Sequence, residues 1–183
     1  MATRDLTDDQ LLQSLIDFCV KYSTPALADD DHVIDGFSNN RQPPDDGNDF
    51  CVVQPIAQRR SGTTIEHWDP TGEEVLELRE YVELDVQIDC YSTNRFDARA
   101  RAQTFETIAR SSVGVEHFLS YGGIDCLYSD DSQNLSGVLD EGLYVSRWML
   151  VIHLGYWKRV EVAQDFFDAV DVNVTNVDVR FKP

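Results

Sequence analysis

Residues able to carry chemistry are few and widely spaced in this sequence. The four histidines stand far apart: His32, His67, His117 and His153. No His-Glu-x-x-His pattern brings two of them onto one helical face. Because His153 is flanked by Ile152 and Leu154, we interpret it as a satisfied histidine of a sheet. Gly-x-Ser-x-Gly, Walker and dinucleotide-binding patterns are absent. We therefore expect no catalytic residues and no cofactor.

One segment has the ligand spacing of a calcium loop. Oxygen-bearing residues occupy the ligand positions of the twelve-residue pattern: Asp130, Ser132, Asn134, Ser136 and Glu141. Leu135, however, stands where the sharp turn of such a loop requires glycine, and no clear helix flanks each end. The runs Asp29–Asp31 and Asp45–Asp46 are typical of solvated acidic loops. The sequence therefore predicts no metal site.

Length and charge exclude several classes of protein. The chain has 183 residues, which correspond to one domain over residues 1–183, and 42% of them are hydrophobic, enough to fill a core. A formal charge of -18 has the wrong sign for binding a phosphate backbone, which excludes an ordinary nucleic-acid-binding protein. Three interpretations of this acidity stay open: adaptation to high salt, repulsion of DNA or other polyanions, and an ordinary soluble surface.

The cysteines and apolar runs indicate a chain without disulfide bonds or membrane-spanning segments. Its four cysteines form no Cys-x-x-Cys pair and have apolar neighbours, so we expect them to be small buried hydrophobes: Cys19, Cys51, Cys90 and Cys126. No run of 18 apolar residues exists, and the first ten residues lack the layout of a signal peptide. We expect no membrane contact, and a chain that stays in the cytoplasm where it is made.

The first elements follow from caps and turn residues. Thr7 to Gln10 matches a capping box and apolar residues follow at helical spacing, which predicts a helix over residues 8–22. Residues 29–48 are rich in Asp, Asn, Gly and Pro, which indicates a long acidic surface loop. Short strands are predicted at 50–56 and 63–68, and the composition after Trp68 is that of a hairpin turn.

The strongest pattern is an alternation from Leu76 to Cys90. Even-numbered positions are mostly apolar and odd-numbered ones mostly polar, which predicts a half-buried strand with one dry and one wet face. Asp85 and Asp89 fall on the wet face, so we expect both carboxylates to be exposed. The dry face sets the register of this strand in a sheet.

A small-residue helix and further strands complete the pattern. Alanines at helical spacing predict a helix over about 97–110 that lies close against the sheet, with Arg101 in water. The remaining predicted elements are a short helix at 115–119, a strand at 124–128 and a central strand at 143–156.

Residues 158–167 fit either a helical turn or an irregular connection. Residues 171–183 alternate again, as a C-terminal strand or arm that pairs within its own sheet or with a neighbouring copy. Trp157, at the end of a strand beside Tyr156 and Lys158, is a candidate for a subunit interface.

A strand-to-helix passage carries a resemblance to a known family. The strand Val86–Tyr91 runs almost at once into the alanine-rich helix Phe96–Ala102, and a β-segment around Arg147 and Trp148 follows. With the first helix and the long acidic loop, this order resembles the neck or tail terminator proteins of tailed bacteriophages and archaeal tailed viruses. The resemblance spans most of the chain.

The resemblance implies an α+β subunit with an antiparallel, possibly mixed, sheet flanked by two to three helices. It implies a virion protein that forms a homo-hexameric ring at the neck, ends the tail tube, and joins the tail to the head–tail connector or stopper protein. DNA would pass through the ring without sequence-specific binding. A closed ring needs two different complementary patches on each subunit. The expected interface residues are Phe37, Trp68, Trp157 and Phe181, and the expected residues of the channel wall are Asp85 and Asp89.

Two other classes stay open on the residues alone. A metal-dependent hydrolase would use the acidic loops, although the sequence shows no paired ligand set. A small α+β protein-binding module, working as a monomer or dimer, would share the same pattern of elements. Solution mass and a metal titration of the melting temperature distinguish these classes from a ring-forming structural protein.

Overall fold

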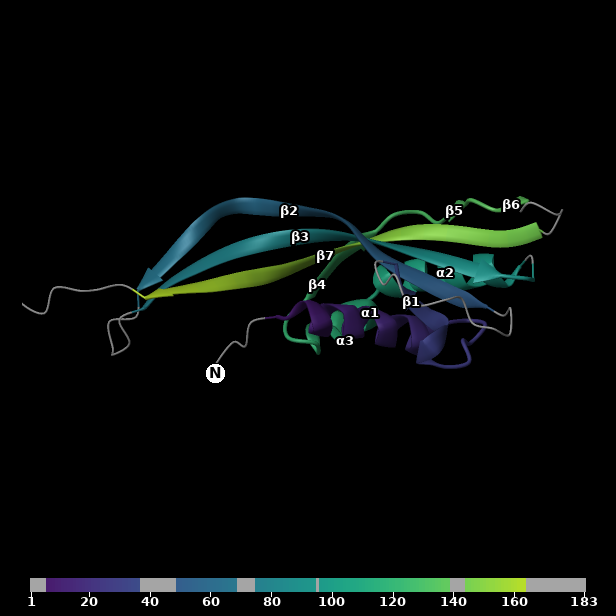
Figure 1. Ribbon diagram of the computed structural model, residues 1–183, viewed down its shortest axis with the longest axis horizontal. Coiled ribbons are helices and arrows are strands. Elements are labelled where there is room, and N and C mark those ends of the chain that lie inside the picture. Colours follow the sequence, from purple (N-terminus) through teal and green to yellow (C-terminus); the bar gives the residue numbers. More distant parts are fainter. Residues whose placement is uncertain (1–5, 37–48, 69–74, 95, 139–143, 164–183) are drawn as a thin grey trace, which may run out of the picture.

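Three very long strands organise the molecule (Figure 1). The computed structural model describes residues 6–36, 49–68, 75–94, 96–138 and 144–163. Strands β2 (Phe50–Trp68), β3 (Val75–Ser92) and β7 (Tyr144–Ala163) have 19, 18 and 20 residues. Strand β3 lies between the other two and is antiparallel to both. The pairing of β2 with β3 confirms the predicted hairpin partners, and the turn between them lies outside the described residues.

Short strands extend this sheet at both edges. Strand β1 (Val33–Asp35) runs parallel to the start of β2, so the sheet is mixed. On the other side, β4 (Asp125–Ser129), β5 (Gln133–Asn134) and β6 (Gly137–Val138) all pair with β7. The main order is β1-β2-β3-β7-β4. This arrangement confirms the α+β class and places β7 inside the sheet.

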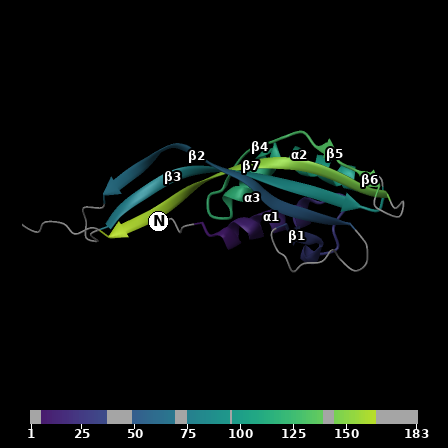
Figure 2. The same cartoon turned by 45° about the horizontal axis from the view of Figure 1, so that its top comes forward.

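Three helices pack together at one end of this sheet (Figures 1 and 2). Helix α1 (Asp8–Tyr22) begins at the predicted capping box, in which the Thr7 side chain accepts from the Gln10 backbone. Helices α2 (Asp97–Ala109) and α3 (Ser112–Leu119) follow β3, and the one-turn helix η1 (Asp30–His32) precedes β1. Small residues of α2, including Ala98 and Ala102, are fully buried, which allows close approach to the sheet.

The core lies between these helices and the even-numbered face of β3. Phe18 of α1 contacts Phe105 of α2 and Phe118 of α3, with ring centroids 5.6 and 5.0 Å apart. Beneath them lie buried residues of the strands, among them Val86, Ile88, Leu150 and Ile152. All four cysteines are buried free thiols, as predicted.

The sheet continues well past the helices, and this divides the molecule into two regions. We call residues 57–68, 75–83 and 156–163 the arm, and the helix-covered remainder of the described chain the body. Within the described residues, the arm is a three-stranded ribbon in which β2 and β7 each pair only with β3. Both views show this ribbon leading away from the helices (Figures 1 and 2).

Several predicted boundaries were wrong, and the long pairing explains them. The two strands expected at 50–56 and 63–68 are one strand, which carries register shifts between Pro55 and Ala57 and between Ser61 and Ile65. Residues 158–163 belong to β7, because β3 offers a continuous partner as far as Val75. Within the expected loop 29–48, η1 and β1 form structure, and residues 37–48 lie outside the described ones.

Arg101 is a further correction. It was expected in water, yet its side chain is fully buried in α2. The guanidinium donates to Asp49 at 2.8 Å and to the Ser23 hydroxyl at 2.9 Å. Burying a cation requires such partners. The arginine therefore joins the end of α1 to the start of β2.

Candidate interaction surface

The odd-numbered face of β3 carries ion pairs rather than free carboxylates. Asp85 accepts from Arg59 Nη2 at 2.8 Å and from His153 Nδ1 at 2.6 Å. Tyr128 stacks on the His153 ring with centroids 4.0 Å apart. As a result only 8% of Asp85 is exposed. The expectation that Asp85 is exposed was wrong, because cations and rings from three other strands cover it.

Asp89 is enclosed in the same way. Arg147 Nε lies 3.0 Å from one of its carboxylate oxygens, and Gln87 donates to the other at 2.7 Å. The Arg147 guanidinium lies 5.6 Å from the centroid of the Tyr91 ring, which itself stacks on Phe50. Asp89 is 3% exposed, so its expected exposure was also wrong. The arginine partners of both aspartates, Arg59 and Arg147, are distant in sequence, and the alternation of β3 alone gave no sign of them.

The arm exposes five large apolar side chains, and the described part of the body exposes others, among them Phe96 and Leu119. Trp68 and Trp157 are 47% and 49% exposed, which leaves both indoles accessible. Other large apolar residues of the arm are also exposed: Ile65, Val160 and Val162. These five residues form what we call the arm surface. Two further predicted interface residues, Phe37 and Phe181, lie outside the described residues. The structure thus leaves two of the four accessible for contact.

The arm is electrically balanced in a strongly acidic chain. It contains five basic residues and five glutamates: Arg59, Arg60, Arg79, Lys158, Arg159, Glu66, Glu77, Glu80, Glu83 and Glu161. The formal charge of the whole chain is -18, so the acidity lies elsewhere in the sequence. Exposed apolar side chains on a surface without net charge are typical of surfaces that contact other proteins.

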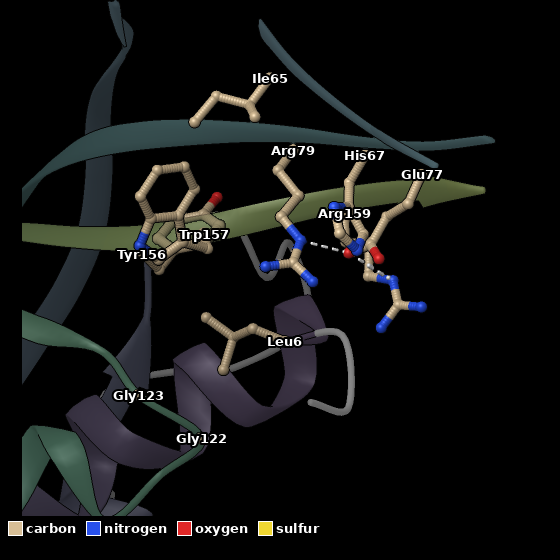
Figure 3. Close-up of a pocket in the computed structure, with 10 residues that line it drawn as sticks. All are labelled: Leu6, Ile65, His67, Glu77, Arg79, Gly122, Gly123, Tyr156, Trp157 and Arg159. Carbon is tan, nitrogen blue, oxygen red and sulfur yellow. Dashed lines mark hydrogen bonds and ion pairs between the residues drawn. The ribbon is translucent and has the colours of Figure 1, made fainter. Parts of the chain in front are cut away.

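A groove of about 420 Å³ lies where the arm meets the body (Figure 3). Trp157 and Ile65 line it from the arm, and Leu6, before α1, lines it from the body. Glu77 pairs with Arg79 and lies 3.0 Å from Arg159 Nε. The hydrogen bond from Arg79 lowers the pKa of Glu77, so this carboxylate stays ionised.

A tyrosine fixes the base of the arm beside this groove. Tyr81 donates to Asp125 at 2.9 Å, and its ring meets Trp157 edge-on at 5.2 Å. Burial and the Asp125 carboxylate raise the pKa of Tyr81 to about 12. The Tyr81 side chain occupies the space where Gly155 has no Cβ. The arm is therefore joined to β4 of the body by a specific contact.

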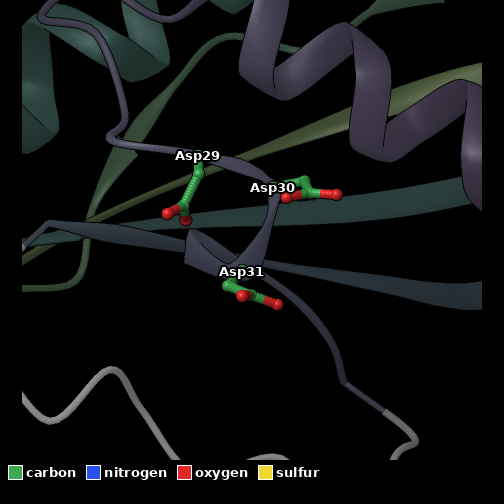
Figure 4. A group of neighbouring side chains, drawn as sticks. All are labelled: Asp29, Asp30 and Asp31. Carbon is green, nitrogen blue, oxygen red and sulfur yellow. The ribbon is translucent and has the colours of Figure 1, made fainter.

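The acidic residues before β1 form a small cluster of exposed carboxylates. Asp29, Asp30 and Asp31 surround η1, with ligand atoms within 4.8 Å of one another (Figure 4). His32 Nδ1 lies 2.6 Å from Asp29, so one carboxylate already has a partner. Exposed acidic groups of this kind are common without an ion. The cluster is a charged part of the surface.

The segment with calcium-loop spacing forms two short strands at the edge of the sheet. Its residues 133–134 and 137–138 are strands β5 and β6, which pair with β7. Asn134 Oδ1 accepts from the Ser136 backbone, and the Ser136 hydroxyl accepts from the Arg147 backbone. Glu141 lies outside the described residues. Two of the five residues with calcium-loop spacing, Asn134 and Ser136, therefore make structural hydrogen bonds.

The histidines and thiols of the body also have structural surroundings. His117 Nε2 lies 3.0 Å from the Ser14 carbonyl, and burial lowers its pKa. His153 lies in β7, and its Nδ1 lies 2.6 Å from Asp85. Burial raises the pKa of the Cys19, Cys90 and Cys126 thiols, which makes them poor nucleophiles. These groups stabilise the body.

Fold and surface together define an α+β protein with a projecting β-arm suited to contacts with other proteins. The chain matches the phage neck terminator protein family over residues 9–178, and it belongs to that family. It is therefore a structural component of the virion, located in the tail or neck. A comparison with curated proteins gave no match. None of the described helices is both long and apolar enough to cross a membrane.

Proposed function

We propose that this protein forms a closed ring of six copies at the neck, where it ends the tail tube. The ring would also join the tail to the head–tail connector or stopper protein and leave a channel for DNA. Membership of the neck terminator family supports the location. The observation that carries the proposal is the arm, which presents exposed Trp68 and Trp157 on a projecting ribbon.

A ring requires each copy to expose two unlike patches that fit each other. The arm supplies one patch, apolar and neutral in net charge. The body supplies the other, acidic and covered by helices. In this proposal Trp68 and Trp157, with Phe37 and Phe181 from the segments outside the described residues, contact neighbouring copies or the tail tube protein. Alanine at an interface tryptophan would weaken assembly, since buried aromatic anchors dominate interface energies.

The acidity has a use in a DNA channel. Carboxylates on the channel wall would repel the phosphate backbone, so the duplex would slide through without sequence-specific binding. Asp85 and Asp89 stay candidates for the wall, but their ion pairs with Arg59 and Arg147 reduce the field they present. Exposed carboxylates such as Asp30 and Asp31 would contribute more if they face the channel.

We further propose that the chain has no enzymatic activity, cofactor or resident metal. His32, His117, His153 and the four cysteines have structural partners or buried surroundings, whereas His67 is exposed in the groove. A metal-dependent hydrolase is the rival, with Asp29–Asp31 as its only candidate cluster in the described part of the chain. A rise in melting temperature with Ca²⁺ or Zn²⁺, together with hydrolysis, would favour that rival.

Mass and shape in solution test the ring. The purified chain would be measured by light scattering over a range of concentrations and imaged in negative stain. We expect six-fold rings, alone or after addition of tail tube protein. Chains that stay monomeric in both conditions would count against the ring and favour a small protein-binding module.

A further inference from the structure

The groove between arm and body has the features of a peptide-binding surface. Trp157 and Ile65, each about half exposed, give it an apolar wall. Arg79 uses its Nε on Glu77, and its two terminal nitrogens extend toward Leu6 in Figure 3. An arginine fork of this kind recognises carboxylates, because its donors match the two oxygens. The groove therefore fits a segment that carries aromatic or apolar residues beside carboxylates.

The sequence that follows β7 has this composition. Residues 164–179 contain four aspartates and no lysine or arginine. Phe166 and Phe167 stand between two of these aspartates, and Val170, Val172 and Val174 alternate with polar residues. An alternating segment of this kind is suited to lie extended along a strand edge. Segment and groove are thus complementary in both charge and polarity.

The direction of the chain favours a neighbouring copy as the source of the segment. Strand β7 runs from Trp157, in the groove, to Ala163 at the far end of the arm. To return to its own groove the chain would have to reverse at once, yet residues 164–169 include no glycine, proline or asparagine. The favoured two-residue hairpin turns all contain a glycine. Twenty residues remain after Ala163 and span up to about 66 Å when extended, enough to reach another subunit.

We propose that residues 164–175 of one copy bind in the arm–body groove of the next copy. The carboxylates of Asp168 and Asp171 pair with Arg79, and the apolar side chains of the segment cover Trp157 and Ile65. This inference rests on the proposed ring, and it names the two patches that one contact of that ring uses. Donor and acceptor are different surfaces, so the contact is heterologous, as closure of a ring requires.

Charge reversal in the full-length chain tests the contact. The groove variant is Arg79→Glu, which leaves Arg159 beside Glu77. The tail variant combines Asp168→Lys with Asp171→Lys and leaves the groove unchanged. Arg60→Glu is the matched control, because Arg60 lies on the same arm, pairs with Glu80 and does not line the groove. Melting temperatures establish that each variant is folded.

The main measurement is the protein concentration at which the chain assembles, determined from its mass in solution. The groove and tail variants should each need roughly tenfold more protein to assemble, since like charges then meet at the contact. Arg60→Glu should assemble like wild type. An equimolar mixture of the groove and tail variants should assemble near the wild-type concentration, because an alternating ring pairs each reversed tail with a reversed groove.

The other outcomes separate this inference from the function. If both variants assemble like wild type, the inference fails while the ring stands. If a chain carrying all three substitutions recovers but the mixture does not, the segment binds its own groove and the assignment to a neighbour is overturned. A wild type that never assembles in solution also contradicts the inference, and rings at the neck of intact particles would then still support the function.

Discussion

The body and the arm are built from the same three strands but differ in what covers them: helices pack on the strands of the body, and none of the described helices packs along the arm. In the body, β3 buries Val86 and Ile88 beneath helices and buries Asp85 and Asp89 under cations. In the arm, the continuing strands leave Trp68, Trp157 and Val160 in solvent. Burial stabilises a single chain, whereas exposed apolar groups gain stability only when a partner covers them. The helix-covered core of the body stabilises the fold, and the exposed indoles of the arm support the proposal that the arm contacts other subunits.

The largest expected loss of stability comes from a substitution in the core of the body. Phe105→Ala would remove a fully buried ring that contacts Phe18, and should lower the free energy of unfolding by about 3–5 kcal/mol. Chemical denaturation of the monomer measures this loss. A loss below about 1 kcal/mol would mean that the helices contribute little to the core, and would break the distinction between the two regions.

The second largest loss of stability is expected from a substitution where the arm joins the body. Gly155→Ala would place a methyl group in the space that Tyr81 occupies, so the tyrosine must move and release Asp125. We expect a loss of about 1–3 kcal/mol. Tyr81→Phe is the control, because it removes only the hydroxyl hydrogen bond and should cost about 1 kcal/mol. Equal losses for the two variants would argue that the close packing at Gly155 is unimportant.

Acid should affect the body before the arm. Burial lowers the pKa of His117 in the folded state, so the unfolded chain binds the extra proton first and stability falls as pH drops below about 6.5. The pKa of Glu77 is also lowered, and its contribution is lost only at lower pH, below about 4.5. Unfolding curves for His117→Gln against pH should show a weaker fall near pH 6 than wild type. An unchanged pH profile would count against this role for His117.

The smallest expected effect on stability is on the arm surface. Trp157→Ala should change the free energy of unfolding of the monomer by about 0.5–1 kcal/mol, since half of the side chain is already in solvent and its contact with Tyr81 is modest. The same variant should impair ring assembly clearly. A large loss of monomer stability with normal assembly would reverse the roles given to arm and body.

The sequence predicted the elements better than the surfaces. The capping box at Thr7 and the alternation of β3 are local signals, and both gave the correct structure. The full length of β2 and β7 was missed because pairing with β3, rather than local composition, extends them. Bulges within β2 break its alternation, so its pattern looks like two short strands.

The buried charges show a second limit. Arg101 lies on the apolar face of α2 by helical spacing, and only its charge suggested exposure to solvent. Its burial depends on Asp49 and Ser23 from distant segments. Asp85 is likewise enclosed by Arg59 and His153. A single sequence does not show which distant charges will meet. Trp157, by contrast, was expected at an interface because the predicted strand ended beside it; the strand continues to Ala163, yet Trp157 is 49% exposed.

Cryo-electron microscopy of the assembled neck tests the central claim most directly. The account predicts six copies in a closed ring between tail tube and connector, with Trp68 and Trp157 of every arm covered by a neighbouring subunit or by the tube. A neck in which this chain is missing, or in which it is present with arms standing free in solvent, would contradict the account.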